Sequence, residues 1–138
     1  MNLLFVCKHN RFRSKVAEAL FRYYYKGDSV KTKSAGTIVD LMHPYVSRAV
    51  HSVLREKGVS IRDDGAVKLD SFMLKWADRI IIVADNISPD MFRDREMIGD
   101  KPVAFWAIRD VSETDIDGIR KKTDEIEQRI LEMIKTLN

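Results

Sequence analysis

The stretch DRIIIVAD, residues 78–85, restricts the possible folds of this chain more than any other segment. It contains four consecutive β-branched residues, Ile80 to Val83. β-branched side chains favour strands, and an unbroken apolar run is typical of a strand that is covered on both faces. We therefore predict a central strand in a sheet that has helices packed on both sides.

Strand and helix patterns alternate along the rest of the chain. Further strands are predicted at 2–6, 30–37 and 101–108, and helices at about 14–27, 43–58 and 88–96 and from about Thr114 onward. The first helix is expected to end near Gly27 and the second to start near Pro44. The residues expected on buried helical faces are Val16, Ala17, Leu20 and Tyr24 in the first helix and Ile116, Ile119, Thr123, Ile126, Ile130 and Ile134 in the last. This alternation predicts a parallel sheet between two layers of helices.

Length and composition indicate one domain, residues 1–138, with a core of its own. No apolar run approaches the ~18 residues that span a bilayer, and the N-terminal run is too short for a signal peptide. With a single cysteine the chain cannot form an internal disulfide, so we expect a cytoplasmic protein. The net charge of +3 suits an anionic substrate but does not indicate nucleic acid.

The only cysteine, Cys7, lies where the first predicted strand passes into the polar segment CKHNRFRS, residues 7–14, which we call the cysteine loop. Ligands of parallel α/β sheets bind beyond the carboxyl ends of the strands. Five residues separate Cys7 from Arg13, and a loop of this size can surround a tetrahedral anion with its N–H groups pointing inward. The start of the next helix adds free N–H groups and partial positive charge.

Arg13 and Ser14 extend this interpretation. An arginine can bind two oxygens of a phosphate at once, and a positive field favours the thiolate, which is the nucleophilic form of cysteine. The Ser14 hydroxyl could cap the helix or donate to the sulfur. A free cysteine can also be an inert buried residue, but the Arg13-Ser14 pair at a strand-to-helix turn argues against that reading.

The chain resembles the low-molecular-weight protein tyrosine phosphatases and the thioredoxin-coupled arsenate reductases, which share one fold. Segment 3–21, LLFVCKHNRFRSKVAEALF, is similar to the family's phosphate-binding loop and first helix. The other similar segments are SAGT at 34–37 and the segments 43–61, 78–86 and 106–126. The resemblance implies a three-layer α/β/α fold with a four-stranded parallel sheet in the flavodoxin-like order 2-1-3-4.

The resemblance also implies roles for individual residues. Cys7 would be the nucleophile and would form a thiophosphate intermediate. Arg13 and the amides of the loop would hold the phosphoryl oxygens, so the phosphate would contact Lys8, His9, Asn10, Arg11, Phe12, Arg13 and Ser14. Ser14 would stabilise the sulfur as a leaving group. Asn10 would hold a strained turn, because asparagine tolerates left-handed backbone angles, and Ser34 would hydrogen-bond to it.

The chemistry further needs a general acid for the leaving group. In the family it is an aspartate before a proline, in the loop after the fourth strand, and Asp110 is the matching candidate here. Asp115 and Asp117 are alternatives, although acidic residues are also common in the first turn of a helix. Asp85, at the end of the 78–85 segment, could orient loop amides or substrate, or could be an ordinary turn residue.

The sequence departs from the family pattern at several positions. Val111 replaces the proline, the segment DVSET replaces a tyrosine pair, and Phe12 occupies the position of a second cysteine. The histidine that many members have shortly after the second helix is absent, and Asp63 stands near its position, so the support of Asn10 and Ser34 could be built differently. Phe12, Trp106 and residues 38–42 could form apolar walls for the substrate, although Trp106 suits the core equally well. His9 is expected to face solvent, and the backbones of Lys8 and Arg11 to matter more than their side chains.

These observations predict a cysteine-dependent phosphomonoester hydrolase, most simply a protein tyrosine phosphatase, that is monomeric and needs no metal or other cofactor. Its partner would be a phosphorylated protein or a small phosphomonoester, with no nucleic acid or membrane. One alternative is an arsenate reductase that uses an external thiol, because the chain lacks the further cysteines for an internal disulfide relay. The other is a non-catalytic phosphate-binding module.

Overall fold

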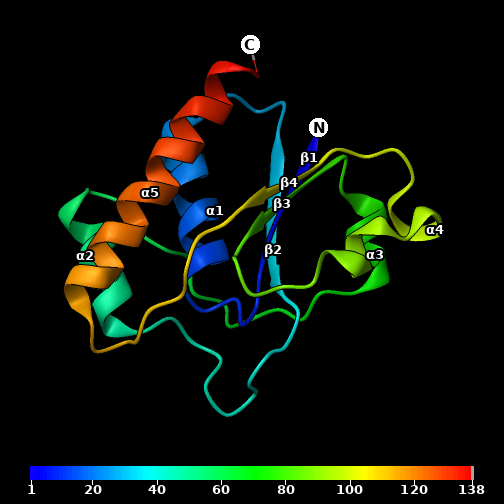
Figure 1. The fold of residues 1–138 in the computed structure, drawn as a ribbon. Helices are drawn as coiled ribbons and strands as arrows, with labels where there is room; N and C mark the ends of the chain where they lie inside the picture. The colour runs from blue at the N-terminus through cyan, green and yellow to red at the C-terminus, as the bar shows by residue number, and fades with distance from the viewer. Residues whose placement is uncertain (138) are drawn as a thin grey trace.

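The computed structural model describes residues 1–137 and contains one parallel four-stranded sheet. Its strands are β1 (Asn2–Cys7), β2 (Lys31–Gly36), β3 (Arg79–Val83) and β4 (Val103–Trp106). They are arranged in the order β2-β1-β3-β4 (Figure 1). The predicted sheet order and parallel direction are therefore confirmed.

Helices cover both faces of this sheet. One face carries α1 (Arg13–Tyr24), α2 (Arg48–Glu56) and α5 (Ile116–Lys135), and the other carries α3 (Ser71–Trp76), the 3₁₀ helix η1 (Pro89–Arg93) and α4 (Arg95–Ile98) (Figure 1). Ile81 and Val83 of β3 pack into the core on the α1 side, and Ile80 and Ile82 into the core on the α3 side. The unbroken apolar run of β3 thus serves two cores at once, as predicted for a central strand.

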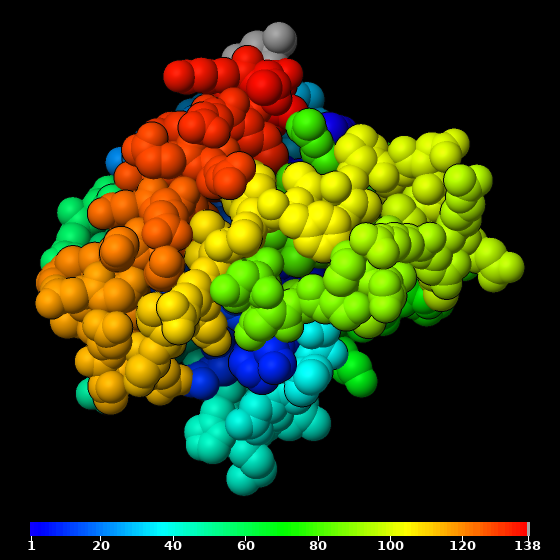
Figure 2. Space-filling view, viewed as in Figure 1, coloured from blue at the N-terminus to red at the C-terminus, as the bar shows by residue number. Residues whose placement is uncertain are grey.

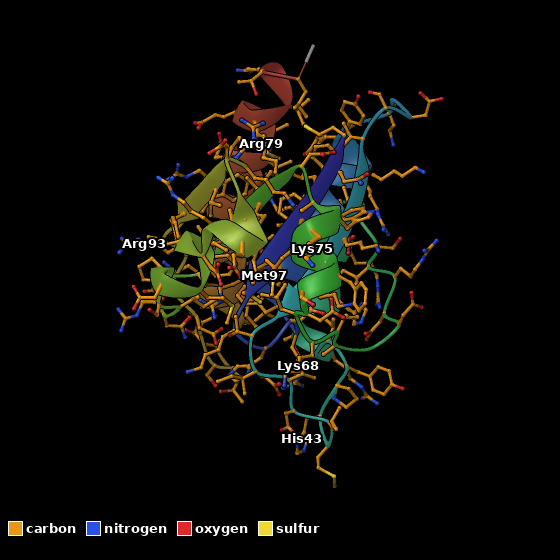
Figure 3. All side chains as sticks on the ribbon, turned by 90° about the vertical axis from the view of Figure 1, so that its right-hand side faces the viewer. His43, Lys68, Lys75, Arg79, Arg93 and Met97 are labelled. Carbon is orange, nitrogen blue, oxygen red and sulfur yellow. The ribbon has the colours of Figure 1, made fainter. Side chains whose placement is uncertain are left out.

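The second layer is seen from outside in Figure 3. There Lys75 of α3 and Met97 of α4 lie over the sheet, while Arg93 points away from it into solvent. No helix in the described part of the chain is long and apolar enough to cross a membrane.

Helix α2 begins at Arg48, so the prediction of a start near Pro44 is wrong. Ser47 caps this helix by accepting a hydrogen bond from the Val50 amide at 3.3 Å. The Pro44 carbonyl instead accepts from the amide of Ala66 at 2.7 Å. Residues 37–47 consequently form a loop that projects past the carboxyl ends of the strands, at the lower edge of Figure 2, with His43 near its tip in Figure 3.

The helix predicted at 88–96 is divided in two. Asp94 has an extended backbone between η1 and α4, and its side chain caps α4 by accepting from the Glu96 amide at 2.9 Å. Helix α3 was not predicted, because six residues are too few to show a helical period. The sequence signal that was available is its cap, Asp70, which accepts from the Met73 amide at 2.9 Å.

Two residues that were expected in the core lie at the surface. Tyr24 is the last residue of α1, which ends there and not near Gly27, and its hydroxyl donates to Glu127 at 2.8 Å. Ile116 is exposed because it is the first residue of α5, ahead of the part that packs on the sheet. Ile119, Thr123, Ile126 and Ile130 are buried as predicted, and Ile134 is partly buried.

Candidate active site

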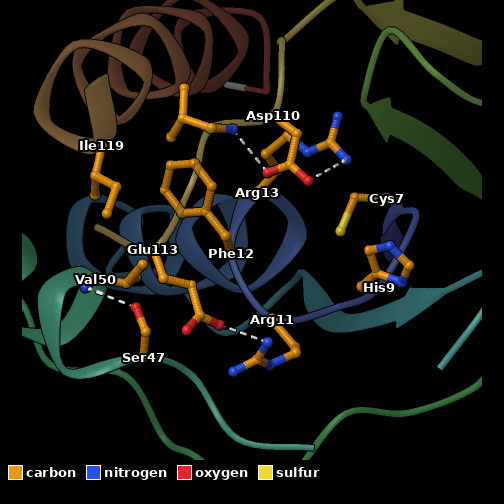
Figure 4. Close-up of a pocket in the computed structure, with 11 residues that line it drawn as sticks. Cys7, His9, Arg11, Phe12, Arg13, Ser47, Val50, Asp110, Glu113 and Ile119 are labelled. Atoms are coloured by element: carbon orange, nitrogen blue, oxygen red, sulfur yellow. Dashed lines mark hydrogen bonds and ion pairs between the residues drawn. The ribbon is translucent and has the colours of Figure 1, made fainter. Parts of the chain in front are cut away.

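Cys7 is the last residue of β1 and is buried below a pocket at the carboxyl edge of the sheet (Figure 4). This position follows from the parallel topology, which brings the exits of β1, β3 and β4 together. Eleven residues line the pocket: Cys7, His9, Arg11, Phe12, Arg13, Ser47, Val50, Asp110, Val111, Glu113 and Ile119.

Two donors are directed at the Cys7 sulfur. The Asn10 amide donates to Sγ at 3.3 Å, and Ser14 Oγ lies 2.9 Å from Sγ. Ser14 Oγ also accepts from Asn10 Nδ2 at 2.7 Å. Because that amide nitrogen can only donate, the serine proton is left for the sulfur. The alternative that Ser14 caps the helix does not hold, because the N-cap position of α1 is Phe12.

Asn10 occupies the centre of the cysteine loop with a left-handed backbone, φ 55°, and no exposed surface. Besides Ser14, its Nδ2 donates to Ser34 Oγ at 3.1 Å, and its Oδ1 accepts from the Val67 amide at 2.9 Å. The Ser34 hydroxyl in turn donates a hydrogen bond to Glu18 Oε1 at 3.0 Å. The side chain of Asn10 is therefore fully engaged, and it ties the loop to β2, to α1 and to the segment around Val67.

Glu18 was not singled out from the sequence. One turn after Ser14, it resembles any exposed helical carboxylate, and only the fold shows that it meets Ser34. Asp63, which was suspected of replacing the family histidine, lies elsewhere: its Oδ2 accepts from the Val46 amide and lies 3.3 Å from His51 Nε2. The support of Asn10 is thus built from Ser34 and Glu18, without a histidine or Asp63.

Gly36 at the end of β2 lies against the back of the cysteine loop. A Cβ atom at this position would come within 2.8 Å of the His9 carbonyl carbon and of the Lys8 oxygen, and within 2.9 Å of the Asn10 nitrogen. All three are backbone atoms, which cannot move aside as a flexible side chain can, so a larger residue at position 36 would displace the loop. The two residues after Gly36 also bind the cysteine loop: the Thr37 amide donates to the Cys7 carbonyl at 3.1 Å, and the Ile38 amide to the Lys8 carbonyl at 2.8 Å.

Arg13, the first residue of α1, is a buried cation beside the sulfur. Its Nη1 donates to Asn86 Oδ1 at 3.1 Å and to the Ile108 carbonyl at 2.9 Å. Asp85 and Asp110 lie 3.8 Å and 3.6 Å from its guanidinium nitrogens. Groups from the exits of β3 and β4 therefore fix the guanidinium, and Asp85 is one of them.

Asp110 is the only one of the three candidate acids among the residues that line the pocket (Figure 4). Its Oδ1 accepts from the Val111 amide at 3.0 Å, and its other oxygen faces Arg13. Asp115 instead caps α5 by accepting from the Gly118 amide at 2.9 Å. Asp117 is highly exposed and pairs with Arg120 at 2.9 Å. The structure brings Asp110 to Cys7 and Arg13, and leaves the two alternatives outside.

Two side chains of the cysteine loop differ from their predicted solvent-facing roles. Arg11 spans the pocket mouth, where Nη1 pairs with Glu113 at 2.6 Å and Nε donates to the Tyr45 carbonyl at 2.9 Å (Figure 4). His9 is partly buried, and its Nδ1 lies 2.8 Å from the Ile38 carbonyl. Arg11 and His9 therefore connect the loop to the segments 37–47 and 110–113.

The apolar walls of the pocket also differ from the expected set. Phe12 lines the pocket as predicted, together with Val50, Val111 and Ile119. Trp106 belongs to the core, where its ring packs against Phe5 at 6.3 Å between centroids. Residues 38–42 are not part of the lining, and three of the four apolar side chains of this segment, Ile38, Leu41 and Met42, are exposed.

A metal site is not apparent in the described residues 1–137, where no group of three or more His, Cys, Asp or Glu side chains gathers around one point. The chemistry that the pocket can support is that of a buried sulfur held by donors, next to an arginine and one pocket-lining aspartate.

The sequence matches the family model described as low molecular weight phosphotyrosine protein phosphatase over residues 2–138. The chain belongs to this family. Comparison with curated proteins gives no match. Membership supports a phosphatase-type enzyme that acts through a cysteine on a phosphorylated substrate, and it leaves the identity of that substrate open.

Solved structures of related proteins cover almost the whole chain. A low molecular weight protein tyrosine phosphatase from T. tengcongensis is 26% identical, with a TM-score of 0.86 over 99% of each chain. An arsenate reductase from Archaeoglobus fulgidus is 31% identical, with a TM-score of 0.76 over 96% of this chain and 98% of that one. The YwlE arginine phosphatase from Geobacillus stearothermophilus is 26% identical, with a TM-score of 0.84 over 99% of this chain and 92% of that one.

Proposed function

We propose that this family member hydrolyses phosphomonoesters through a phosphocysteine intermediate. The Cys7 thiolate attacks phosphorus, the bond from phosphorus to the leaving-group oxygen breaks, and Asp110 gives that oxygen a proton. Water then attacks the phosphocysteine, Asp110 takes up a proton from it, and the sulfur leaves as thiolate with release of phosphate.

The observation that carries this proposal is the placement of donors around the sulfur. The Ser14 hydroxyl at 2.9 Å and the Asn10 amide at 3.3 Å stabilise negative charge on Sγ. That charge is present before attack and again when the sulfur leaves. The nearby Arg13 guanidinium suits the equatorial phosphoryl oxygens, whose charge the site must hold in the transition state.

Hydrolysis of p-nitrophenyl phosphate in the presence of EDTA tests the proposal. The wild type should turn over, and Cys7→Ser and Arg13→Ala should each lose about 1,000-fold or more, because each removes a group that the transition state requires. Arg129→Gln, a substitution on the outer part of α5, is the matched control. Full activity in Cys7→Ser would overturn the mechanism, whereas vanadate binding without turnover in the wild type would favour a non-catalytic binding module.

For the substrate, we propose a phosphotyrosine residue. The walls that Phe12, Val50, Val111 and Ile119 provide suit an aromatic leaving group. The two carboxylates at the pocket, Asp110 and Glu113, already face Arg13 and Arg11. This neutralisation weakens the case for a cationic leaving group such as that of phosphoarginine. Values of kcat/KM for matched phosphotyrosine, phosphoserine and phosphoarginine peptides test this assignment. We expect the highest value for the phosphotyrosine peptide, and a preference for phosphoarginine would reject the assignment.

Arsenate reduction with an external thiol is a second candidate, favoured by the 31% identity to the Archaeoglobus fulgidus protein. Arsenate has the shape and charge of phosphate, so the same loop would accept it. Cys7 is the only cysteine, so the thiol that resolves the Cys7–arsenate adduct would have to come from another molecule. Arsenate-dependent NADPH consumption in the presence of thioredoxin or glutaredoxin, lost in Cys7→Ser, would support this activity.

A further inference from the structure

Lys15 is a buried cation that the proposed chemistry does not use. It follows Ser14 in the first turn of α1 and is 6% exposed. Its Nζ donates to the Gly65 carbonyl at 3.0 Å, and no carboxylate pairs with it among the described residues. An ammonium group has three donors, and burying an ion without a counter-ion is costly. Two of the three N–H groups of Lys15 are therefore free for a ligand.

Lys15 is one of the residues that line a surface hollow beside the edge strand β2. Two adjoining depressions, both lined by Lys15, Glu18, Arg22 and Arg62, make up this hollow. It has no lining residue in common with the Cys7 pocket. The charged side chains around it are Lys15, Arg22, Lys33 and Arg62 on the positive side and Glu18, Asp64 and Asp70 on the negative side.

Two of the three carboxylates of the hollow already accept hydrogen bonds, and one of them is paired with a cation. Glu18 accepts from Ser34 at 3.0 Å and from Arg22 at 3.2 Å. Asp70 caps α3 through the Met73 amide. Among the cations, Arg22 is used by Glu18 and by Thr32, to which it donates at 3.0 Å.

Three cations of the hollow keep their charge unpaired within the described chain. Lys15 has only its carbonyl partner, Lys33 lies 4.5 Å from the centroid of the Trp76 ring, and Arg62 has no ion pair. Asp64 and Asp70 are the two carboxylates of the hollow that no ion pair among the described residues engages, so the three cations exceed them by one charge. The hollow thus has a local excess of positive charge around a buried donor, which is the arrangement an oxyanion requires.

We propose that this hollow is a second oxyanion site that takes a phosphate group, either inorganic phosphate or the phosphate of a small metabolite. Lys15 binds it at the floor, and Arg62 and Lys33 bind it at the rim. Binding here does not rest on the proposed function of Cys7. The hollow nevertheless lies next to the support of the cysteine loop, because Ser34, which binds Asn10, and Glu18, which binds Ser34, are among its lining residues. The Gly65 carbonyl that Lys15 contacts lies two residues before Val67, whose amide binds Asn10.

Amide NMR during a titration with inorganic phosphate separates the two sites residue by residue. In the wild type, the amides of residues 33–34 and 64–67 should shift along a saturable curve of their own, distinct from that of residues 8–14. Lys15→Met should weaken the hollow's response about tenfold or more and leave the curve of residues 8–14 in place. Arg129→Gln, which removes a cation elsewhere, should change neither curve.

Three additions keep the test decisive. If Lys15→Met does not fold, the double variant Lys33→Gln/Arg62→Gln, which changes only rim residues, should show the same selective loss. A sugar phosphate in place of inorganic phosphate identifies the source, since tighter binding assigns the hollow to an organic phosphate and weaker binding to the free ion. The proposal is overturned if residues 33–34 and 64–67 do not respond, or respond equally in the variants. The Cys7→Ser protein should retain the hollow's curve, so failure of the catalytic proposal would not be confused with failure of this one.

Discussion

At the residue scale, the environment of one sulfur atom depends on a single asparagine. Asn10 supplies its backbone amide to Cys7 and its side chain to Ser14, Ser34 and the Val67 amide. A residue with φ 55° and no exposed surface must satisfy both steric and hydrogen-bonding demands. Asparagine meets both, because it adopts left-handed angles more readily than most residues and carries a donor and an acceptor.

Two substitutions of Asn10 separate these demands. Asn10→Gly keeps the backbone angle but loses the side-chain bonds, whereas Asn10→Ala loses both. Both variants should lose about tenfold or more in kcat/KM for p-nitrophenyl phosphate. Asn10→Ala should in addition unfold more easily than Asn10→Gly, by about 1 kcal/mol in urea titrations. Wild-type kinetics in either variant would show that the network does not support the loop.

Gly36 offers a second test at this scale, with Gly58 as its control. A methyl group at Gly36 meets three backbone atoms of the cysteine loop at 2.8–2.9 Å, so Gly36→Ala should displace the loop and weaken vanadate binding about tenfold or more. Gly58 has φ +75° and no atom nearer than 3.8 Å. Gly58→Ala should therefore cost about 1 kcal/mol of stability and leave vanadate binding unchanged. The account of Gly36 fails if both variants bind vanadate like the wild type.

The sequence was sufficient to predict that Cys7, Asn10, Arg13 and Ser14 lie together, because these residues are close in the chain and the loop has a recognisable spacing. It was not sufficient for Glu18, whose contact with Ser34 depends on how α1 packs against β2. The side chain of Arg11 was underrated for the same reason, since its partners Glu113 and Tyr45 are far away in the sequence.

At the element scale, the start of α5 separates two aspartates that sequence alone leaves in competition. Asp110→Asn should lower kcat about 100-fold or more on substrates with poor leaving groups, because they need a proton, and should leave stability nearly unchanged. Asp115→Ala should do the reverse: it removes the N-cap of α5 and costs about 1 kcal/mol in the free energy of unfolding. Steady-state kinetics and urea titration of both variants check this, and the opposite pattern would mean that the acid is misassigned.

The pairing of α2 with α5 gives a pH-dependent prediction. Arg120 donates two hydrogen bonds to Glu56, both at 2.9 Å, and these bonds, with the positive charge, lower the pKa of Glu56 below its ordinary value. A lowered folded pKa means that the contribution to stability is present at neutral pH and disappears as the pH falls through that pKa. Glu56→Gln should thus lower the urea midpoint at neutral pH, by less as the pH falls, and not at all below the lowered pKa.

The effect should be modest and should shrink with added salt, because both side chains are exposed. A deficit in Glu56→Gln that stays the same at acidic pH would show that lost packing, and not the ion pair, is responsible.

Elements were predicted well where they bury a continuous face and poorly where they are short. β3 and α5 have long, regular patterns, and their packing matches them. The helices α3 and α4 have six and four residues, and end caps define them better than a period does. α2 was predicted to start too early because the apolar pattern before Arg48 belongs to a loop. Hydrogen bonds to the Asp63 side chain and to the Ala66 amide hold this loop in place.

At the scale of the whole molecule, the sheet separates two hydrophobic cores and contributes side chains to both. Ile81 and Ile82 are neighbours in β3 but face opposite cores, which also contain or contact Trp106 and Trp76 respectively. Because β3 joins the two cores, we expect the chain to unfold in one transition. Ile81→Ala and Ile82→Ala should each cost about 2–5 kcal/mol.

Fluorescence in single-tryptophan proteins, Trp76→Phe and Trp106→Phe, checks this cooperativity. The remaining tryptophan should report the same urea midpoint in each, and each isoleucine variant should shift both reporters together. Separate midpoints for the two tryptophans would show that the cores unfold independently.

The central claim is that Cys7 carries the phosphoryl group during turnover. The most direct measurement is mass spectrometry of the wild-type protein, quenched with acid during the hydrolysis of p-nitrophenyl phosphate. We predict one phosphoryl group on the peptide that contains Cys7, more of it in Asp110→Asn, because Asp110 also takes up the proton of the attacking water, and none in Arg13→Ala. Turnover with no phosphoryl group on Cys7 at any time, or with the group on another residue, would contradict the account.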